Sequence, residues 1–514
     1  MLLAAQRVLA IVTFPFYIEG DGYTYYHLLK DLQSSLIHAT GYCLSFFPAK
    51  LLASVAGCSP ADVLRILQHV VSVAAVAFLH QGLRLVVPRG LSFATCLLVG
   101  GDLLAVTAAT TSRPEFWQAD LIVLMAGALL RAMTSNDPRT KRRWYTGLGV
   151  VFGIAFATKY NSLPCAAFFA APLLDRDLAF AARVRTALRC GIAAVLTLVV
   201  FVATFHWPTT GCVHFNLEHG WIHMQKLGLA KIPIVPENGI ATRKYIALVH
   251  SLRNIGAGPS QWRSLDAVSP DERAPFRAKF GALLTTTDEA TVDAALAPFR
   301  SELRPGGTYH DPTDFCRIYH HLGLLETEAL LADVYAEGKA ARPHEYWSHV
   351  ASIAAEGVGY RGAYLPYQPT TSLRPAFFEH ADRGLFGDRL RVLMADDEVY
   401  LKEPEWAANF WRPGAELLSR FAFLRFVPEA VVWIAIGIGL LGGAFVARRD
   451  RRRLPVLALQ ITALLAVAGM IAFSALVFVF RPKELIAMQP LLVILAGLAV
   501  ANVGWLARRG ASAP

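Results

Sequence analysis

Charged residues are scarce in this chain of 514 residues, and their scarcity excludes an ordinary soluble protein. Only 17% of the residues are Asp, Glu, Lys or Arg, whereas 54% are hydrophobic. Soluble domains usually carry about 25% charged residues. The apolar residues lie in long continuous runs and do not alternate with polar ones, which favours transmembrane helices over a transmembrane β-barrel. The composition therefore predicts an all-α polytopic membrane protein.

Motifs for several other kinds of chemistry are also missing. The sequence has no Walker A loop, no GxGxxG after a strand and no HExxH, so nucleotide-driven transport and zincin chemistry have no support. Its seven cysteines form no CxxC motif, and their pairing cannot be deduced from the sequence. Residues 2–18 lack a small-residue cleavage site, which predicts a retained first helix and not a cleaved signal peptide.

The net charge of +10 follows the membrane topology, so it implies no nucleic-acid partner. Cations gather between the apolar runs, as in "RTKRR" (139–143) and "RRDRRR" (448–453). The positive-inside rule predicts that these connections and both termini are cytoplasmic. About ten spans fit this pattern. They are residues 2–18, 62–87, 91–110, 116–133, 145–159, 161–174, 190–207, 428–447, 455–475 and 485–507. The fifth and sixth are short, which leaves a re-entrant or broken pair open.

The same topology divides the chain into three parts. An N-terminal transmembrane module (1–207) contains a first outer loop (19–60), and a C-terminal transmembrane module covers 428–514. Between them, residues 208–427 form an outer segment of about 220 residues, long enough for a domain. Helical patterns predict that this insertion is mostly helical. They are a capping-box spacing between Thr286 and Glu289, a continuous pattern over 311–338 and another over 344–356.

The stretch "EGDGYTYYHLLKDLQSS" (19–35) follows the first span on the outer side. Asp21 stands between two glycines, where it could cap a helix or act as a general base on an incoming hydroxyl. The tyrosines after it, Tyr25 among them, suggest an interfacial belt at the lipid headgroups.

Further acids and cations lie at the expected outer ends of later spans. "TTSRPEFWQAD" (110–120) contains Arg113, Glu115 and Asp120. Glu115 in a first helical turn complements the helix dipole, whereas Asp120 lies deeper, where acids are rare and usually face a polar interior. The cations Lys159, Arg481 and Lys483 fit either headgroup anchoring or the binding of a lipid phosphate. His219 and His223, four residues apart, fit a metal site less well than an amphipathic surface helix.

Four stretches of the sequence, in their order along the chain, resemble the GT-C superfamily of membrane glycosyltransferases. "GDGYTYYHLLKDLQSS" resembles the "GDG-x-x-YY" opening of bacterial members, which are similar to the protein O-mannosyltransferases and the lipid A aminoarabinose transferase. "GYCLSFFPAKLLASVAG" (41–57), "WYTGLGVVFGIAFATKYNSLP" (144–164) and "RPKELIAMQPLLVILAG" (481–497) resemble later family segments. The resemblance implies a GT-C-like bundle of about ten transmembrane helices with a large, mostly helical periplasmic insertion.

The resemblance also implies a function. Such enzymes are inverting glycosyltransferases of the bacterial inner membrane. They move a hexosyl or pentosyl group from a polyprenyl-phosphate-linked donor to a lipid, glycan or protein acceptor at the periplasmic face. No cofactor is implied, and a need for a divalent metal stays open. A transporter or flippase for a lipid-linked sugar is the alternative, although the matched halves typical of transporters are not visible. A non-catalytic assembly protein is a third hypothesis.

Site roles follow from the resemblance residue by residue. Asp21 corresponds to the acid/base carboxylate, and Glu115 or, less well, Asp120 to a second acid. Lys159 and Arg481 correspond to cations that bind the lipid phosphate. The remaining substrate-binding candidates are Lys483, Arg113, Asp120 and Tyr25. The chain departs from many relatives in having Glu19-Gly20-Asp21 in place of an Asp-Glu pair, and Lys483-Glu484 in place of an Arg-Tyr pair.

Overall fold

The structure is a computed structural model of the whole chain. It describes residues 1–13, 25–26, 28–29, 31–32, 34–35, 40–101, 106, 109, 112, 114–211, 213, 219–255, 270–303, 309–359, 429–477 and 482–511.

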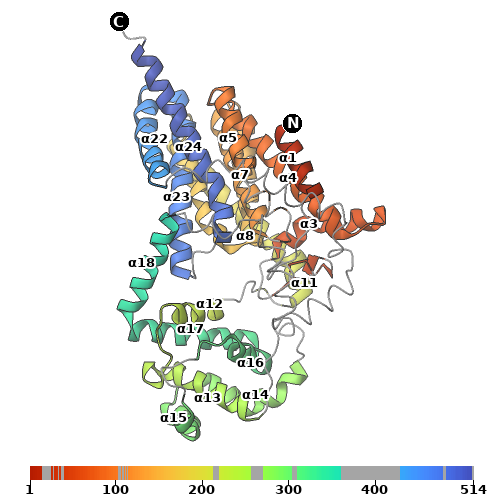
Figure 1. The fold of residues 1–514 in the computed structure, drawn as a ribbon, viewed down its shortest axis with the longest axis vertical. Coiled ribbons are helices and arrows are strands. Elements are labelled where there is room, and N and C mark those ends of the chain that lie inside the picture. The colour runs from red at the N-terminus through yellow and green to blue at the C-terminus, as the bar shows by residue number, and fades with distance from the viewer. Residues whose placement is uncertain are drawn as a thin grey trace.

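The described helices form two parts, a long bundle and a smaller insert (Figure 1). In the bundle, α1 (Leu2–Thr13) begins and α24 (Pro482–Ala511) ends on the side away from the insert. The insert covers the described residues between 219 and 359, and its last helix, α18 (Pro343–Gly359), runs from the insert toward α23 (Leu454–Val477) of the bundle. Each part has its own buried apolar core.

The remaining helices of the bundle come from both ends of the chain. The N-terminal half contributes α3 (Gly41–Ala56), α4 (Pro60–Leu83), α5 (Arg89–Gly101), α7 (Pro114–Thr134), α8 (Pro138–Thr158), the 3₁₀ helix η1 (Tyr160–Ala170), α9 (Ala171–Leu174), α10 (Phe180–Phe201), the π-helix η2 (Val202–His206) and α11 (Trp207–Thr210). The C-terminal half contributes α22 (Glu429–Arg449) and the 3₁₀ helix η10 (Arg451–Arg453) before α23 and α24.

The insert contains α12 (His219–Leu229), the 3₁₀ helix η3 (Pro236–Asn238), α13 (Ile240–Asn254), α14 (Pro270–Thr285), α15 (Glu289–Leu296), the 3₁₀ helix η5 (Ala297–Glu302), α16 (Pro312–Leu322) and α17 (Leu324–Ala341) before α18. The mostly helical character expected for this segment is confirmed over its described residues.

Five helical segments among the described residues are long and apolar enough to cross a membrane. They are Pro60–Leu83, Pro114–Thr134, Phe180–Thr210, Arg451–Val477 and Ala487–Arg508. Each overlaps one of the expected spans, and no described residue is in a β-strand. The all-α polytopic class is therefore confirmed.

The expected pair of spans at 145–159 and 161–174 takes a different form. A single α-helix, α8, begins at Pro138 and includes the basic run, with the side chain of Asp137 capping its first turn through the N–H groups of Arg139 and Thr140. The following segment is the 3₁₀ helix η1 instead of an α-helical span. Pro164 lies inside η1, and proline lacks the N–H that an α-helix interior requires.

Two helix predictions in the insert were wrong in detail. The N-cap of α15 is Asp288, whose carboxylate accepts from the N–H of Thr291, and not Thr286. The pattern over 311–338 forms two helices, α16 and α17, because Gly323 separates them with φ +108, a backbone conformation that other residues rarely adopt.

Two carboxylates of α17 join the helices of the insert. Glu337 accepts from the N–H groups of Ala241 and Thr242 at the start of α13, at 2.9 and 2.8 Å. Glu328 accepts from the N–H of Gly220 in α12 at 2.5 Å. The first N–H groups of a helix have no partner within it, so these carboxylates satisfy donors that would otherwise lack one. Helix α17 is thereby the central element of the insert.

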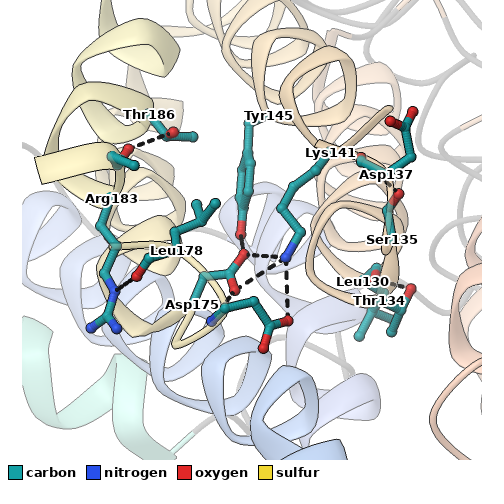
Figure 2. Close-up of polar contacts among 12 residues, drawn as sticks. Leu130, Thr134, Ser135, Asp137, Lys141, Tyr145, Asp175, Leu178, Arg183 and Thr186 are labelled. Atoms are coloured by element: carbon teal, nitrogen blue, oxygen red, sulfur yellow. Dashed lines mark hydrogen bonds and ion pairs between the residues drawn. The ribbon is translucent and has the colours of Figure 1, made fainter. Parts of the chain in front are cut away.

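A buried ion pair ties α8 to the loop before α10, on the end of the bundle that carries the basic connections (Figure 2). The ammonium of Lys141 lies 3.2 and 2.9 Å from the two carboxylate oxygens of Asp175, and both side chains are almost fully buried. The hydroxyl of Tyr145 donates to the same carboxylate at 3.2 Å. Asp177, largely exposed, adds a second carboxylate 3.4 Å from Lys141. This cluster fixes the α8 start against the following loop.

Candidate functional site

Glu115 and Lys159 form an enclosed ion pair at one end of the bundle. Glu115 lies in the first turn of α7, and Lys159 is the residue that follows the last residue of α8. The Nζ atom of Lys159 lies 2.5 Å from Oε1 of Glu115, and the two side chains are 11% and 4% exposed. Two of the candidate residues, 44 positions apart, are thus in direct contact.

The chain around Lys159 is held by a second side chain of α7. Lys159 has an extended backbone (φ −161, ψ 125), which ends α8 and turns the chain into η1. Gln118, one helical turn after Glu115, donates to Oδ1 of Asn161 at 2.6 Å and to Oγ of Ser162 at 2.8 Å. Gln118 was not predicted from the sequence. Its only signal is a polar residue three positions after Glu115 in an apolar helix, where i and i+3 share a face.

An aromatic chain connects the segment after Asp21 to this pair. The rings of Tyr25 and Tyr42 meet edge to face at 6.0 Å, and Tyr42 meets Phe116 in the same way at 6.0 Å. Phe116 follows Glu115 directly. The hydroxyl of Tyr42 donates to Gln68 of α4 at 2.7 Å, so this ring is fixed in place. Tyr25, four residues after Asp21, is therefore linked through Tyr42 to the helical turn that carries Glu115.

The expectation of an interfacial tyrosine belt is wrong for the two tyrosines that the structure describes in this stretch. Tyr25 is 6% exposed and Tyr26 is fully buried. Both belong to the core of the bundle, because their rings pack against other core side chains and do not face outward.

A buried hydrogen-bonded cluster holds the next part of the same loop. Oγ of Ser34 lies 2.6 Å from Nδ1 of His206 and 2.6 Å from Oγ1 of Thr40, and the backbone N–H of Ser34 donates to Thr209 at 3.3 Å. His206 is the last residue of the π-helix η2, a rare conformation that is frequent at functional sites. The first outer loop is thereby joined to the end of the long helical segment that begins with α10.

The start of α3 packs closely on the end of α8. A Cβ atom at Gly41 would lie 2.6 Å from the backbone carbon of Ala157 and 2.8 Å from the backbone nitrogen of Thr158. Any larger residue would push the two segments apart, so glycine allows this approach. Because Lys159 comes directly after Thr158, the start of α3 packs on the residues just before the cation of the pair.

Asp120 belongs to a different cluster. It lies five residues after Glu115, about 140° around the helix, and faces the side opposite to Lys159. Asp120 is hydrogen-bonded to Ser72 and lies in the field of Arg7, both buried. The guanidinium of Arg7 also donates to Ser72 at 3.1 Å and to the carbonyl oxygen of Gly100 at 2.8 Å. Neither Arg7 nor Ser72 was predicted from the sequence.

Several candidates cannot be placed with these. Asp21, Arg113 and Arg481 lie outside the described residues, and Lys483 lies in the first turn of α24 with its side chain outside them. Within the described part of the chain, no group of three or more His, Cys, Asp or Glu side chains could hold a metal ion. His223 there stacks on Tyr335, with ring centroids 4.2 Å apart.

A family model matches the part of the chain that carries the ion pair. Residues 43–207 match the model described as dolichyl-phosphate-mannose-protein mannosyltransferase. The match contains Glu115, Lys159 and His206, and it confirms, over this segment, the resemblance to GT-C glycosyltransferases that the motifs indicated. The comparison with curated proteins gives no match.

Two solved structures are similar to the chain at low identity. One is the archaeal oligosaccharyltransferase AglB from Archaeoglobus fulgidus, in complex with an inhibitory peptide and a dolichol-phosphate. It has 12% identity and a TM-score of 0.36, and the match covers 99% of this chain and 51% of that chain. The other is ArnT from Cupriavidus metallidurans bound to undecaprenyl phosphate, with 11% identity, a TM-score of 0.31 and coverage of 93% and 77%. The chain therefore spans about half the length of the archaeal protein.

Proposed function

We propose that the protein is an inverting glycosyltransferase that uses a polyprenyl-phosphate-linked sugar as donor. The acceptor is a lipid, glycan or protein hydroxyl at the periplasmic face of the bacterial inner membrane. The observation that carries the proposal is the Glu115–Lys159 pair inside the matched segment 43–207, with Tyr42 packed on Phe116 and Tyr25 packed on Tyr42.

The proposed reaction needs one base and a stabilised leaving group. The acceptor oxygen forms a bond to the anomeric carbon on the face opposite the phosphate, and its proton passes to the carboxylate of Asp21. The bond between the anomeric carbon and the phosphate oxygen breaks, and polyprenyl phosphate leaves with the electron pair. A positioned carboxylate contributes roughly 10²–10⁴-fold to such a step. Cations stabilise the developing phosphate charge best where water is excluded.

The ion pair fits a role in binding the donor phosphate. A lysine ammonium is a compact point charge with three donors, so Lys159 can exchange one carboxylate partner for a phosphate oxygen. Glu115 holds that ammonium in place in the free protein. Glu115 is the proposed second acid. Arg481, Lys483 and Arg113 are further proposed phosphate ligands, and Tyr25 a proposed wall of the sugar site. Asp120 is proposed to neutralise Arg7 instead of contacting substrate, because it faces the other side of α7.

The proposed orientation follows from the distribution of charge. The basic connections "RTKRR" and "RRDRRR" lie at the opposite ends of their helices from the insert (Figure 1). With those connections in the cytoplasm, the pair, the first outer loop and the insert lie on the periplasmic side. A donor lipid can then reach the pair from the bilayer between the helices.

The test is transfer by the purified full chain in nanodiscs. Polyprenyl-phosphate-linked sugars with a radiolabelled sugar are supplied with a membrane extract as acceptor source, and labelled products are separated from donor. We expect transfer by the wild type and by Asp62→Asn, a control carboxylate in the first turn of α4. Asp21→Asn and Glu115→Gln are expected to lose it. Movement of the donor between leaflets without any labelled product would establish the transporter alternative instead.

A further inference from the structure

The insert contacts the bundle at the last turn of α23. Lys226 of α12 is fully buried, and its ammonium donates to the backbone carbonyl oxygen of Ala475. The hydroxyl of Tyr346 in α18 donates to the carbonyl oxygen of Leu476 at 3.5 Å. Two helices of the insert thus reach neighbouring carbonyl groups on one helix of the bundle.

Charge and hydrogen bonding explain why these contacts hold. Ala475 and Leu476 lie in the last turn of α23 that the structure describes, and a helix carries partial negative charge toward its C-terminal end. The ammonium of Lys226 and the hydroxyl of Tyr346 donate to these two carbonyl groups, and the lysine also supplies a positive charge. The insert is therefore bonded to α23 from a distant part of the chain.

The donors themselves are held rigidly. The hydroxyl groups of Tyr346 and Tyr335 lie 2.5 Å apart, and the ring of His223 stacks on Tyr335. The ammonium of Lys226 lies 5.5 Å from the centre of the Tyr346 ring. Burial and the nearby charge of Lys339 lower the pKa of Lys226 to about 8, so most molecules keep the ammonium charged at neutral pH.

The part of α23 that Lys226 contacts leads back to the ion pair. Phe473, two residues before Ala475, meets the ring of Tyr160 at 5.8 Å, and Tyr160 directly follows Lys159. One turn earlier in α23, a Cβ atom at Gly469 would lie 2.7 Å from the side chain of Pro164, so α23 and η1 are in close contact. A continuous series of contacts and chain neighbours among the described residues therefore joins Lys226 to Lys159.

We infer that Lys226 is a positioning residue for the Glu115–Lys159 pair, because it holds the insert on the outer end of α23 and α23 holds η1. The consequence for sugar transfer rests on the proposed function, whereas the effect on Lys159 does not. The insert is then part of the machinery that orders the site, and its detachment loosens the Lys159 side of the pair.

The first test measures the exposure of Lys159 without any substrate. The full chain in nanodiscs is labelled briefly with an amine-reactive reagent, and the modification of Lys159 is followed by mass spectrometry. We expect Lys226→Met to raise the labelling rate of Lys159 by roughly 2- to 30-fold, the range of a coupling through packed elements. Lys226→Arg should restore most of the protection. Lys339→Met is the control, since Lys339 lies 5.0 Å from the Tyr346 ring but contacts no described carbonyl of α23.

A second test separates positioning from general destabilisation. Proteolysis of the folded chain reports whether residues 219–359 stay compact in Lys226→Met. With a compact insert, we expect the donor KM for transfer to rise about 2- to 30-fold, because Lys159 is the proposed phosphate ligand, with little change in the acceptor KM. Phe473→Leu combined with Lys226→Met should be less than additive, because both act through α23.

The outcomes distinguish this inference from the proposed function. Unchanged Lys159 labelling in Lys226→Met overturns the inference even if the wild type transfers sugar. Equal labelling changes in Lys226→Met and Lys339→Met overturn it too. A wild type without transferase activity overturns the proposed function, while the labelling result still decides the role of Lys226.

Discussion

Lys159 and Glu115 are each other's partner across the ends of α8 and α7, and the pair is almost closed to solvent. Removing one member of a buried ion pair leaves an uncompensated charge, which costs about 3–5 kcal/mol. The pair thus has two roles to separate by experiment, stabilisation of the fold and, as proposed, binding of the donor phosphate.

Variants of the pair are expected to differ in kinetics. Glu115→Gln should lower kcat by about 10²–10⁴-fold if Glu115 takes part in proton transfer. Lys159→Met should mainly raise the donor KM, because it removes a charge that binds phosphate. Steady-state rates at varied donor concentration measure both, with stability followed by thermal unfolding. If Lys159→Met loses as much stability as Glu115→Gln but leaves the donor KM unchanged, the result contradicts binding of the donor phosphate by Lys159.

Asp120→Asn tests which carboxylate is the second acid. Because Asp120 faces Arg7 and Ser72, we expect this variant to keep transfer activity within about tenfold of the wild type. Arg7→Met should instead lower the free energy of unfolding by about 3–5 kcal/mol, since it leaves Asp120 buried without its cation. Transfer assays and thermal unfolding measure the two effects. An activity loss in Asp120→Asn as large as in Glu115→Gln would assign the second acid to Asp120.

Ser34→Ala tests the attachment of the first outer loop to His206. Loss of a neutral hydrogen bond typically costs about 0.5–1.5 kcal/mol, so the variant should fold. We expect faster proteolytic cleavage within residues 31–40 and a lower transfer rate. Ser54→Ala is the matched control, because exposed Ser54 donates to the carbonyl oxygen of Leu51 in its own helix. Identical cleavage rates in the two variants would show that the contact with His206 does not hold the loop.

Lys141→Met should strongly destabilise the basic end of the bundle. It removes the cation between Asp175 and Asp177 and leaves Asp175 buried, at a cost of about 3–5 kcal/mol. Asp177→Asn, at the exposed partner, should cost about 1 kcal/mol or less. Thermal unfolding of the purified variants gives the comparison. Similar midpoints for the two variants would mean that the Asp175 pair adds little to stability.

The stability of the insert is expected to fall in acid. Burial lowers the pKa of His310 below its ordinary value, while its Nε2 lies 3.0 Å from the carbonyl oxygen of Ile232. In the unfolded chain the imidazole takes up a proton near pH 6.5, whereas in the folded insert it stays neutral to lower pH. The unfolded state thus binds more protons as pH falls through 6.5, and folding loses stability there.

Proteolysis coupled to mass spectrometry at pH 7.5 and 5.5 measures this effect on residues 219–359. His310→Gln should reduce the difference between the two pH values, whereas exposed His344→Gln should leave it unchanged. Equal resistance of the wild-type insert to proteolysis at both pH values would contradict the expected loss of stability in acid.

The sequence predicted the apolar helices well because a run of about 20 apolar residues has few alternatives. It predicted Lys159 as a candidate because an outer cation opposes the topology bias. It could not predict that Glu115 is the partner, since contact between residues 44 positions apart depends on the packing of α7 against α8.

The missed residues share a physical reason. Gln118, Arg7 and His206 are single polar side chains in apolar helices, and their roles depend on which neighbouring helix they face. The form of η1 was missed because 3₁₀ and α-helices have similar apolar patterns over a short stretch. The break at Gly323 could have been predicted from the sequence, since a glycine inside a helical pattern often ends the helix.

The carboxylates of α17 bear on the order in which the insert is built. Glu328 and Glu337 bond to the first turns of α12 and α13, at sequence separations of 108 and 95–96 residues. Contacts between such distant residues require closure of long loops, which slows folding. During synthesis from the N-terminus, α12 and α13 leave the ribosome well before α17 exists. We expect both helices to stay unfinished until then, so a chain truncated before Glu328 should expose them to chaperones and proteases.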